Sequence, residues 1–181
     1  MSIELRGKTL GLRTWQKGDE EALAQLANNR KIWMNLKDSF PHPYARKDAE
    51  AWIESVLKHG DAPHHFAIVR GDEVLGCTGF EPYEDVHRLT AGVGYWIGEP
   101  YWGGGMATEA LGLLTEYVFE RFDFERLEAA VYAWNPASRR VLEKAGFACE
   151  GKHARSVVKD GQLIDSWIYA RLRSDPPARG S

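Results

Sequence analysis

The sequence predicts an α/β domain built on one mixed β-sheet with helices on both of its faces. Three observations carry this prediction. Apolar residues alternate in several short segments, as in strands, and recur every three to four residues in others, as in helices. Short turns join several predicted strands directly, which favours antiparallel pairs. One long predicted helix lies between two strands, which favours a parallel pair and therefore a mixed sheet.

The first half of the chain supplies a strand, two helices and three further strands. Leu10 and Leu12 alternate with other residues in the opening strand, and apolar residues on the helical period mark both helices. Pro41 and Pro43 separate the helices, because the residue before a proline disfavours helix. Gly71 permits a tight turn between the next two strands. The predicted ranges are strand 9–14, helix 19–29, helix 47–59 and strands 65–70, 74–81 and 92–97.

The second half supplies a long helix, a strand, a short helix and a final hairpin. The long helix follows Gly105 and has one apolar face, formed by Ala107, Leu111, Leu114 and Val118. The short helix has Asn135 as its N-cap, Pro136 at its first position and Gly146 just past its end. The remaining predicted ranges are strands 127–134, 147–158 and 163–172, which brings the sheet to about seven strands.

A single domain is expected at residues 1–174, followed by a flexible tail at residues 175–181. A chain of 181 residues suits one domain with a substantial core, and no internal repeat divides it. The last residues are mostly small, charged or proline, which is typical of a frayed terminus.

Composition and charge exclude several classes of function. The formal net charge is −3 and the longest basic run is the pair Arg139–Arg140, so direct nucleic-acid binding is not expected. There is no run of about 18 apolar residues and no signal-peptide core, which predicts a cytoplasmic protein without a membrane segment. Cys77 and Cys149 form no paired motif, so neither a disulfide framework nor a metal site is expected.

The glycine-rich turn before the long helix is the strongest functional signal. Six of the 18 glycines lie at residues 92–105, and three of them are consecutive. Glycine lets the backbone approach a ligand closely, and a helix N-terminus offers unpaired N–H groups and a positive dipole end. The turn therefore suits a pyrophosphate, although a plain flexible turn is the alternative reading.

Two other phosphate-binding motifs fit less well. A nucleoside-triphosphate loop needs a lysine after its last glycine, and none follows Gly105. A dinucleotide fingerprint would place glycine where Thr108 stands, although Glu128 could serve as its ribose-binding acid. About a hundred residues also precede the turn, whereas such a fingerprint usually opens its domain.

Two segments resemble the motifs of a known family. Residues 93–97 (VGYWI) and 100–110 (PYWGGGMATEA) resemble the acetyl-CoA-binding motif of the GNAT acetyltransferases. Residues 135–138 (NPAS) and 141–147 (VLEKAGF) resemble the motif that follows it. The combination is most similar to the branch that contains the RimJ/RimL ribosomal-protein N-terminal acetyltransferases, and the resemblance extends over residues 9–172.

The resemblance implies the GNAT acyl-CoA N-acyltransferase fold, acetyl-CoA as cosubstrate, no metal, and a homodimer. Backbone N–H groups of the glycine turn would hold the pyrophosphate, and an N–H near Ile97 would bind the thioester oxygen. Asn135 would contact pantetheine and Ser138 would lie near the sulfur, although both could simply cap or begin their helix. The implied cofactor-binding residues are Trp96, Ile97, Gly98, Gly103, Gly104, Gly105, Met106, Ala107, Thr108, Asn135 and Ser138.

The chain departs from the family pattern at three positions, and the last two of them, Gly92 and Val157, concern the general base. Pro100 replaces the Arg or Gln that often precedes the glycines, and Gly92 replaces an acid at the start of the strand. Val157 stands where RimL-like enzymes can carry a glutamate. The general base is therefore not carried over from the family. Glu81, at the end of a strand that faces the expected thioester region, is the predicted carboxylate; its alternative is a solvated residue before Pro82.

The missing acids favour a weakly basic acceptor. An N-terminal α-amine has a pKa near 7.7–8.0, so roughly a tenth of it is neutral at pH 7, whereas lysine, near 10.4, is almost never neutral. We predict direct transfer of acetyl to a peptide N-terminus within a ternary complex, with Ser138 and Glu81 as catalytic residues and Asp165 and Arg155 as further candidates for substrate contact. The alternatives are a small amine such as a polyamine, aminoglycoside or amino acid, a non-catalytic acyl-CoA sensor, and, third, a nicotinamide oxidoreductase.

Overall fold

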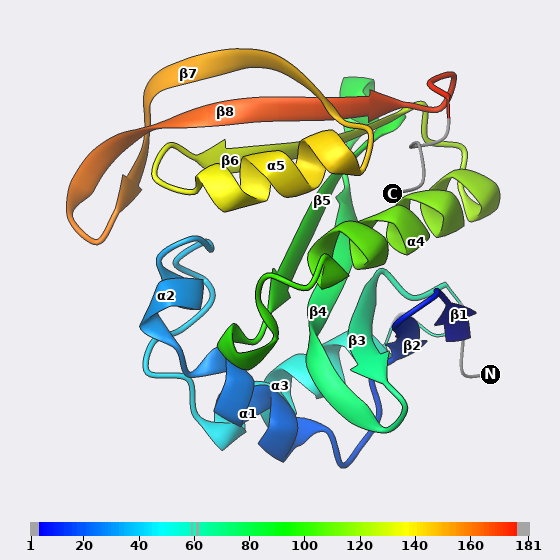
Figure 1. Cartoon of the computed structure of the whole chain (residues 1–181), viewed down its shortest axis with the longest axis vertical. Coiled ribbons are helices and arrows are strands. Elements are labelled where there is room, and N and C mark those ends of the chain that lie inside the picture. The colour runs from blue at the N-terminus through cyan, green and yellow to red at the C-terminus, as the bar shows by residue number, and fades with distance from the viewer. Residues whose placement is uncertain (1–3, 59, 61, 177–181) are drawn as a thin grey trace.

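An eight-stranded mixed sheet runs through the part of the chain that the computed structural model describes, which is residues 4–58, 60 and 62–176 (Figure 1). Its strand order is β1-β2-β3-β4-β5-β6-β8-β7. Every neighbouring pair is antiparallel except β5 and β6, which are parallel because α4 connects them. The strands are β1 (Glu4–Arg6), β2 (Gly11–Thr14), β3 (His65–Arg70), β4 (Glu73–Pro82), β5 (Thr90–Ile97), β6 (Arg126–Tyr132), β7 (Ala148–Lys159) and β8 (Gln162–Leu172).

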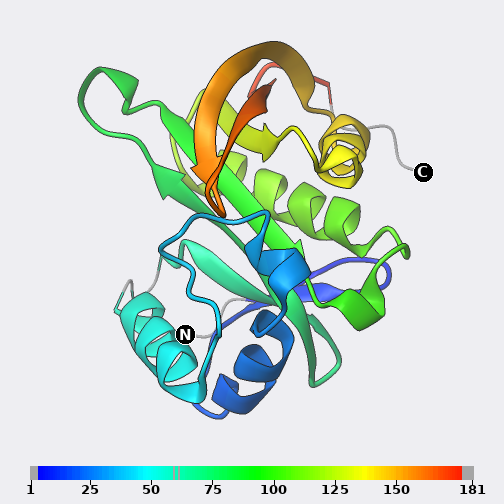
Figure 2. The same ribbon diagram turned by 90° about the vertical axis from the view of Figure 1, so that its left-hand side faces the viewer.

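Helices cover the two faces of this sheet in different places (Figures 1 and 2). The helices α4 and α5 pack on one face, where they bury a core that includes Leu111, Leu142 and Tyr169. The helices α1 and α3 pack on the other face of the N-terminal strands, around Trp15 and Ile53. The helices are α1 (Glu20–Ala27), α2 (Arg30–Trp33), α3 (Arg46–Leu57), α4 (Met106–Arg121) and α5 (Pro136–Lys144), with short 3₁₀ turns η1 (Asp85–His87) and η2 (Glu99–Tyr101).

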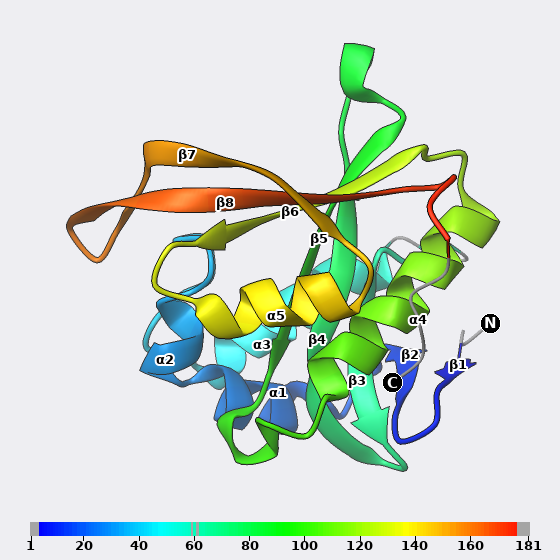
Figure 3. The same cartoon turned by 45° about the horizontal axis from the view of Figure 1, so that its top comes forward.

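The two central strands separate part-way along their length. β5 and β6 pair only from Thr90 to Gly92 and from Arg126 to Glu128, although both strands continue beyond these residues. Figure 3 shows β5 and β6 diverging from this point. The sheet therefore has a V-shaped opening, which we call the splay, at its centre. Backbone groups on the facing edges of the splay have no ladder partner from the opposite strand.

The predicted fold class and most element ranges agree with the structure. The mixed sheet, the parallel pair around the long helix and the helices on both faces are all present. One strand and one α-helix were missed, namely β1 and α2, as were the two short 3₁₀ turns. A three-residue strand is too short to show alternation, and the four-residue α2 depends on capping by the Asn29 side chain, which accepts from Lys31 and Ile32 N–H. β1 brings the described sheet to eight strands, one more than predicted.

The first residue of the predicted tail contacts the end of β8. The Asp175 carboxylate accepts a hydrogen bond from the Leu172 N–H at 2.8 Å, and the Asp175 N–H donates back to the Leu172 carbonyl at 3.1 Å. Asp175 is therefore held against the end of β8. The rest of the predicted tail, residues 177–181, lies outside the described residues.

Candidate active site

The glycine turn presents a row of backbone N–H groups at the start of α4. Gly103 and Gly105 adopt φ angles of 86° and 76°, which only glycine adopts without strain. The N–H groups of Thr108 and Glu109 both donate to the Gly105 carbonyl, at 3.0 and 3.1 Å. Within the described residues, no acceptor pairs with the N–H groups of residues 103–107. Five consecutive donors at a helix N-terminus fit an anion such as pyrophosphate, whereas the Thr108 N–H, also predicted to bind it, is already engaged.

The one carboxylate in the first turn of α4 points away from this row of donors. Glu109 accepts hydrogen bonds from the Thr9 N–H, at 2.9 Å, and from the Thr9 hydroxyl. Burial disfavours its charge, but the bonds from Thr9 and the neighbouring backbone outweigh this and lower the pKa of the carboxyl. Glu109 thus fastens the β1–β2 turn to α4 and leaves the glycine turn free of competing negative charge.

The edge of β5 that faces the splay carries the second set of backbone donors. The Gly98 N–H donates to the Leu75 carbonyl on β4 at 2.8 Å. Since successive N–H groups of a strand point to opposite edges, the N–H and carbonyl of Ile97 point toward the splay. The Trp102 indole N–H reaches this edge and donates to the Ile97 carbonyl at 2.7 Å. The Ile97 N–H therefore faces the splay, and its role as a donor to a thioester oxygen stays a prediction.

Ser138 and Tyr95 meet on the α4 side of the splay. The two hydroxyl oxygens are 2.8 Å apart, and the Tyr95 hydroxyl is also 3.2 Å from the Ser138 carbonyl. Burial raises the pKa of Tyr95 to about 12, so this phenol keeps its proton at neutral pH. The Asn135 side chain accepts from the Ser138 N–H at 3.1 Å, so Asn135 caps α5 and fixes the serine at the splay.

On the opposite face, the face of α1 and α3, three residues form a row across the sheet. Gly92 on β5 pairs with Glu81 on β4 and with Glu128 on β6. Paired residues project to the same face, so two carboxylates flank a glycine at the narrow end of the splay. The Glu81 carboxylate turns toward β3, where it contacts His65 Nε2 at 2.8 Å, and its side chain is 63% exposed. The Tyr83 hydroxyl donates to Glu128 at 2.9 Å.

Comparison with known proteins agrees with this geometry. The family described as "Acetyltransferase (GNAT) domain" matches residues 9–148. The chain belongs to the GNAT acetyltransferases. It is 31% identical over 179 residues to the probable N-acetyltransferase YjcK of Bacillus subtilis, which covers 94% of this chain and 98% of that protein. This GNAT chain is therefore an N-acetyltransferase that uses acetyl-CoA.

Two further relatives carry more specific names. The ribosomal-protein-serine acetyltransferase of Escherichia coli is 24% identical over 168 residues, covering 91% of this chain and 93% of that protein. The structure of Mycobacterium smegmatis RimJ in complex with CoA-disulfide superimposes with a TM-score of 0.81 at 24% identity, covering 94% of this chain and 86% of that chain. At this identity the second likeness shows the fold alone.

The acetyltransferase has contacts beside the splay whose ion pairs the sequence did not reveal. The tip of the β7–β8 hairpin contacts the segment 30–38: Lys159 Nζ lies 3.8 Å from the centre of the Trp33 ring and 2.7 Å from Asp38. Arg30 and Asp160 form a second ion pair at 2.6 Å. Burial raises the pKa of Tyr132, with a further contribution from the charge of Asp38. We call these two ion pairs and the Trp33 ring the clamp.

Several predicted and missed residues of the acetyltransferase can now be placed. Trp96 lies on the α1 and α3 face, with its ring centre 6.0 Å from that of Phe40, and Gly98 follows it at the end of β5. Asp165 is occupied by an ion pair with Lys152 at 2.5 Å and by the Arg155 N–H at 2.7 Å. Sequence analysis missed Tyr83, Tyr95 and the clamp, because their roles depend on pairing between distant strands. Side chains two residues apart on a strand share a face, so Tyr95 lies on the same face as Ile97. This is the one sequence signal that could have placed Tyr95 on the Ser138 side.

The described residues contain neither a cluster of metal ligands nor a helix that could span a membrane. Over this part of the chain, no group of three or more His, Cys, Asp or Glu side chains is arranged to hold a metal ion. None of the described helices is long and apolar enough to cross a membrane.

Proposed function

We propose that this enzyme acetylates the α-amine of a peptide or protein N-terminus by direct attack on acetyl-CoA in a ternary complex. The observation that carries the proposal is the splay, which opens to the two faces of one sheet. Five free N–H groups and Ser138 lie on the α4 and α5 side, and the row Glu81–Gly92–Glu128 lies on the other. Acetyl-CoA and an amine can therefore approach the splay from opposite faces.

The residues for acetyl-CoA follow from the donors that the chain leaves unpaired. The N–H groups of residues 103–107 would hold the pyrophosphate, and Met106 and Ala107 contribute their backbone alone. A β5 N–H that faces the splay, at Ile97 or nearer the narrow end at Tyr95 or Val93, would donate to the thioester oxygen as negative charge develops there, which favours attack at the carbonyl carbon. Trp96 and Gly98 flank Ile97, and Asn135 and Ser138 approach from α5.

The leaving sulfur needs modest assistance. A thiol has a pKa near 8.5, so a thiolate leaving group is tolerable at neutral pH when a hydroxyl donates to it. Ser138 lies on the correct side of the splay, and Tyr95, 2.8 Å from it, keeps its proton and can support the donation. Ser138 would therefore lower the barrier for expulsion of CoA rather than bind the ground state.

Two considerations favour an α-amine as the acceptor: its low pKa and the acceptors for which relatives are named. No carboxylate occupies the Gly92 position, and an α-amine needs less help to lose its proton than a lysine side chain. The Escherichia coli relative at 24% identity is named for a ribosomal-protein serine, and a structural neighbour is titled as an alpha-N-protein acetyltransferase of ribosomal L7/L12. Glu81 remains a prediction for the group that accepts the amine proton, on the acceptor face of the sheet.

The experiment measures CoA release with a thiol reagent from acetyl-CoA plus a panel of acceptors. The panel holds N-terminal peptides, the same peptides with blocked N-termini and a free lysine, polyamines, aminoglycosides and amino acids. Turnover confined to free N-terminal peptides is expected. Turnover confined to polyamines, aminoglycosides or amino acids would refute the peptide acceptor. Tight acetyl-CoA binding without any turnover would instead favour a sensor.

A further inference from the structure

Attack by an amine on the thioester releases a proton, and the narrow end of the splay holds a hydroxyl that can take it. A Cβ atom built on Gly92 would lie 3.1 Å from the Tyr83 hydroxyl oxygen. The hydroxyl therefore occupies the space over β5 that a side chain at position 92 would fill. Gly92 is the last residue of β5 that pairs with β6 before the strands diverge. Tyr83 thus places a polar atom beside the point where the splay begins.

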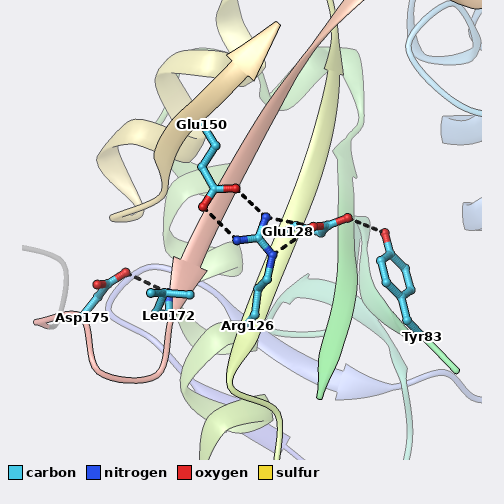
Figure 4. A network of polar contacts seen from close by, with 6 residues as sticks. All are labelled: Tyr83, Arg126, Glu128, Glu150, Leu172 and Asp175. Atoms are coloured by element: carbon cyan, nitrogen blue, oxygen red, sulfur yellow. Dashed lines mark hydrogen bonds and ion pairs between the residues drawn. The ribbon is translucent and has the colours of Figure 1, made fainter. Parts of the chain in front are cut away.

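The Tyr83 hydroxyl is connected to a carboxylate that is itself fixed. It donates to Glu128 at 2.9 Å, and Arg126 donates to the same carboxylate at 3.0 and 3.1 Å (Figure 4). Arg126 also binds Glu150 on β7 through two bonds of 2.8 and 2.6 Å. The chain of contacts is thus Tyr83, Glu128, Arg126 and Glu150, and it extends from the splay across three strands.

This network ends at water rather than in the core. Glu128 and Arg126 side chains are each 25% exposed, and Glu150 is 47% exposed. A surface hollow of about 350 Å³ is lined by Arg126, Glu128, Glu150 and His153. A proton that reaches Glu128 can therefore pass to solvent in this hollow.

We propose that Tyr83 and Glu128 form a relay that removes the proton from the attacking amine. As the C–N bond forms, the amine proton moves to the Tyr83 oxygen, directly or through one water, while the tyrosyl proton moves to the Glu128 carboxylate. The carbonyl electron pair moves to oxygen; when it returns, the C–S bond breaks and its electron pair leaves with sulfur. Glu128 then releases its proton to solvent, which restores both groups.

The chemical state of Tyr83 suits a relay rather than a base. Burial and the bond to Glu128 raise the pKa of Tyr83 to about 12, so the phenol is protonated whenever an amine arrives. A protonated phenol can accept one proton only as it donates its own. The titratable and charged groups around it are Glu128 and Arg126 of β6, Glu150 and His153 of β7, and the Glu81–His65 pair on the far side of Gly92.

The position of the relay also distinguishes it from Glu81. Glu81 projects from β4, one strand away from the splay, and its carboxylate turns further away to His65 on β3. Glu128 projects from β6, which forms one edge of the splay itself. The inference rests on the proposed function only in assuming that a nucleophile attacks the thioester at the narrow end of this opening.

The test compares Tyr83→Phe and Glu128→Gln with a matched control, Glu73→Gln. Glu73 accepts from one tyrosine and one arginine, Tyr101 and Arg70, just as Glu128 does, but it lies at the β3–β4 turn. We expect Tyr83→Phe and Glu128→Gln each to lower kcat about 100-fold at pH 7. The double variant should be no slower than the singles, because both act in one relay. Glu73→Gln should stay within about twofold of the wild type.

Three further readouts separate a relay from a structural role. Acetyl-CoA Kd by calorimetry and the Tm should match between Tyr83→Phe and wild type. The loss of rate in Tyr83→Phe should persist above about pH 8, because even a neutral α-amine must lose a proton as the C–N bond forms. Slow hydrolysis of bound acetyl-CoA should fall in parallel, because an attacking water must lose a proton at the same place.

The outcomes distinguish this inference from the proposed function. A Tyr83→Phe enzyme within about twofold of wild-type kcat overturns the relay, as does an equal loss in Glu73→Gln. A large loss in Glu81→Gln alone assigns the proton to Glu81 and also overturns it. If no peptide is acetylated but hydrolysis falls in Tyr83→Phe, the peptide acceptor fails and the relay stands.

Discussion

The two ion pairs of the clamp should contribute very differently to stability, and Asp38→Asn tests this. The Lys159 side chain is 1% exposed although its partner Asp38 is 73% exposed. Removal of the Asp38 charge leaves the buried ammonium group without this anion, next to the Trp33 ring, whose centre is 3.8 Å away. Loss of one partner of a fully buried pair costs about 3–5 kcal/mol. Because Asp38 is exposed, we discount this to about 2 kcal/mol.

The control is the second ion pair of the same clamp. Arg30 and Asp160 side chains are 58% and 31% exposed, so Asp160→Asn should cost about 0.5 kcal/mol or less. Asp160 has a φ of 49°, a conformation that asparagine also tolerates, so the backbone is preserved. In a chain of this size, the two variants should lower the Tm by about 4–8 °C and by 2 °C or less, respectively.

The assay is urea unfolding followed by tryptophan fluorescence, supported by a thermal scan at low and high salt. The double variant Asp38→Asn with Lys159→Met removes both charges and should recover most of the lost stability. High salt should leave the Asp38→Asn effect nearly unchanged. Equal losses in Asp38→Asn and Asp160→Asn, or a double variant less stable than Asp38→Asn, would refute the reasoning.

Three further predictions concern the glycine turn, the serine and acid stability. Ser138→Ala should lower kcat about tenfold and leave acetyl-CoA Kd within twofold, and an unchanged kcat in a steady-state assay would remove its role at sulfur. Gly105→Ala places a Cβ on a residue with φ 76°, which costs about 1 kcal/mol or more, and should weaken acetyl-CoA binding about tenfold by calorimetry. Folding lowers the pKa of Glu109, so its contribution is present above about pH 4.3, the unfolded value, and is lost as pH falls through the folded value. Glu109→Gln should therefore flatten the acid limb of stability against pH, and a limb identical to that of the wild type would contradict this sign.

Elements with their own periodicity were predictable from the sequence. The strand at residues 65–70 coincides with β3, and α5 begins and ends where Asn135, Pro136 and Gly146 indicate. These elements are encoded by local patterns of burial and capping. α2 is not, because its four residues are too few to show a period.

The features of the candidate site can likewise be divided into those that the sequence could predict and those that it could not. The glycine turn and the Ile97 edge were predictable, because backbone donors depend only on where a strand and a helix begin and end. Partners such as Tyr83 with Glu128, 45 positions apart, depend on the register between strands. Register is fixed by the packing of the whole sheet, and no short segment contains that information.

Before acetyl-CoA binds, the folded chain has an incomplete hydrogen-bond ladder at the splay. The sheet remains unfinished between β5 and β6, since the strands pair at three positions and then separate. The pantetheine arm carries two amides, and an extended amide chain is the natural partner for a strand edge. Bound acetyl-CoA would then act as a temporary ninth strand that completes the ladder with its own groups. Recognition of this kind reads the backbone of β5 and leaves its outward side chains free to differ between acceptors.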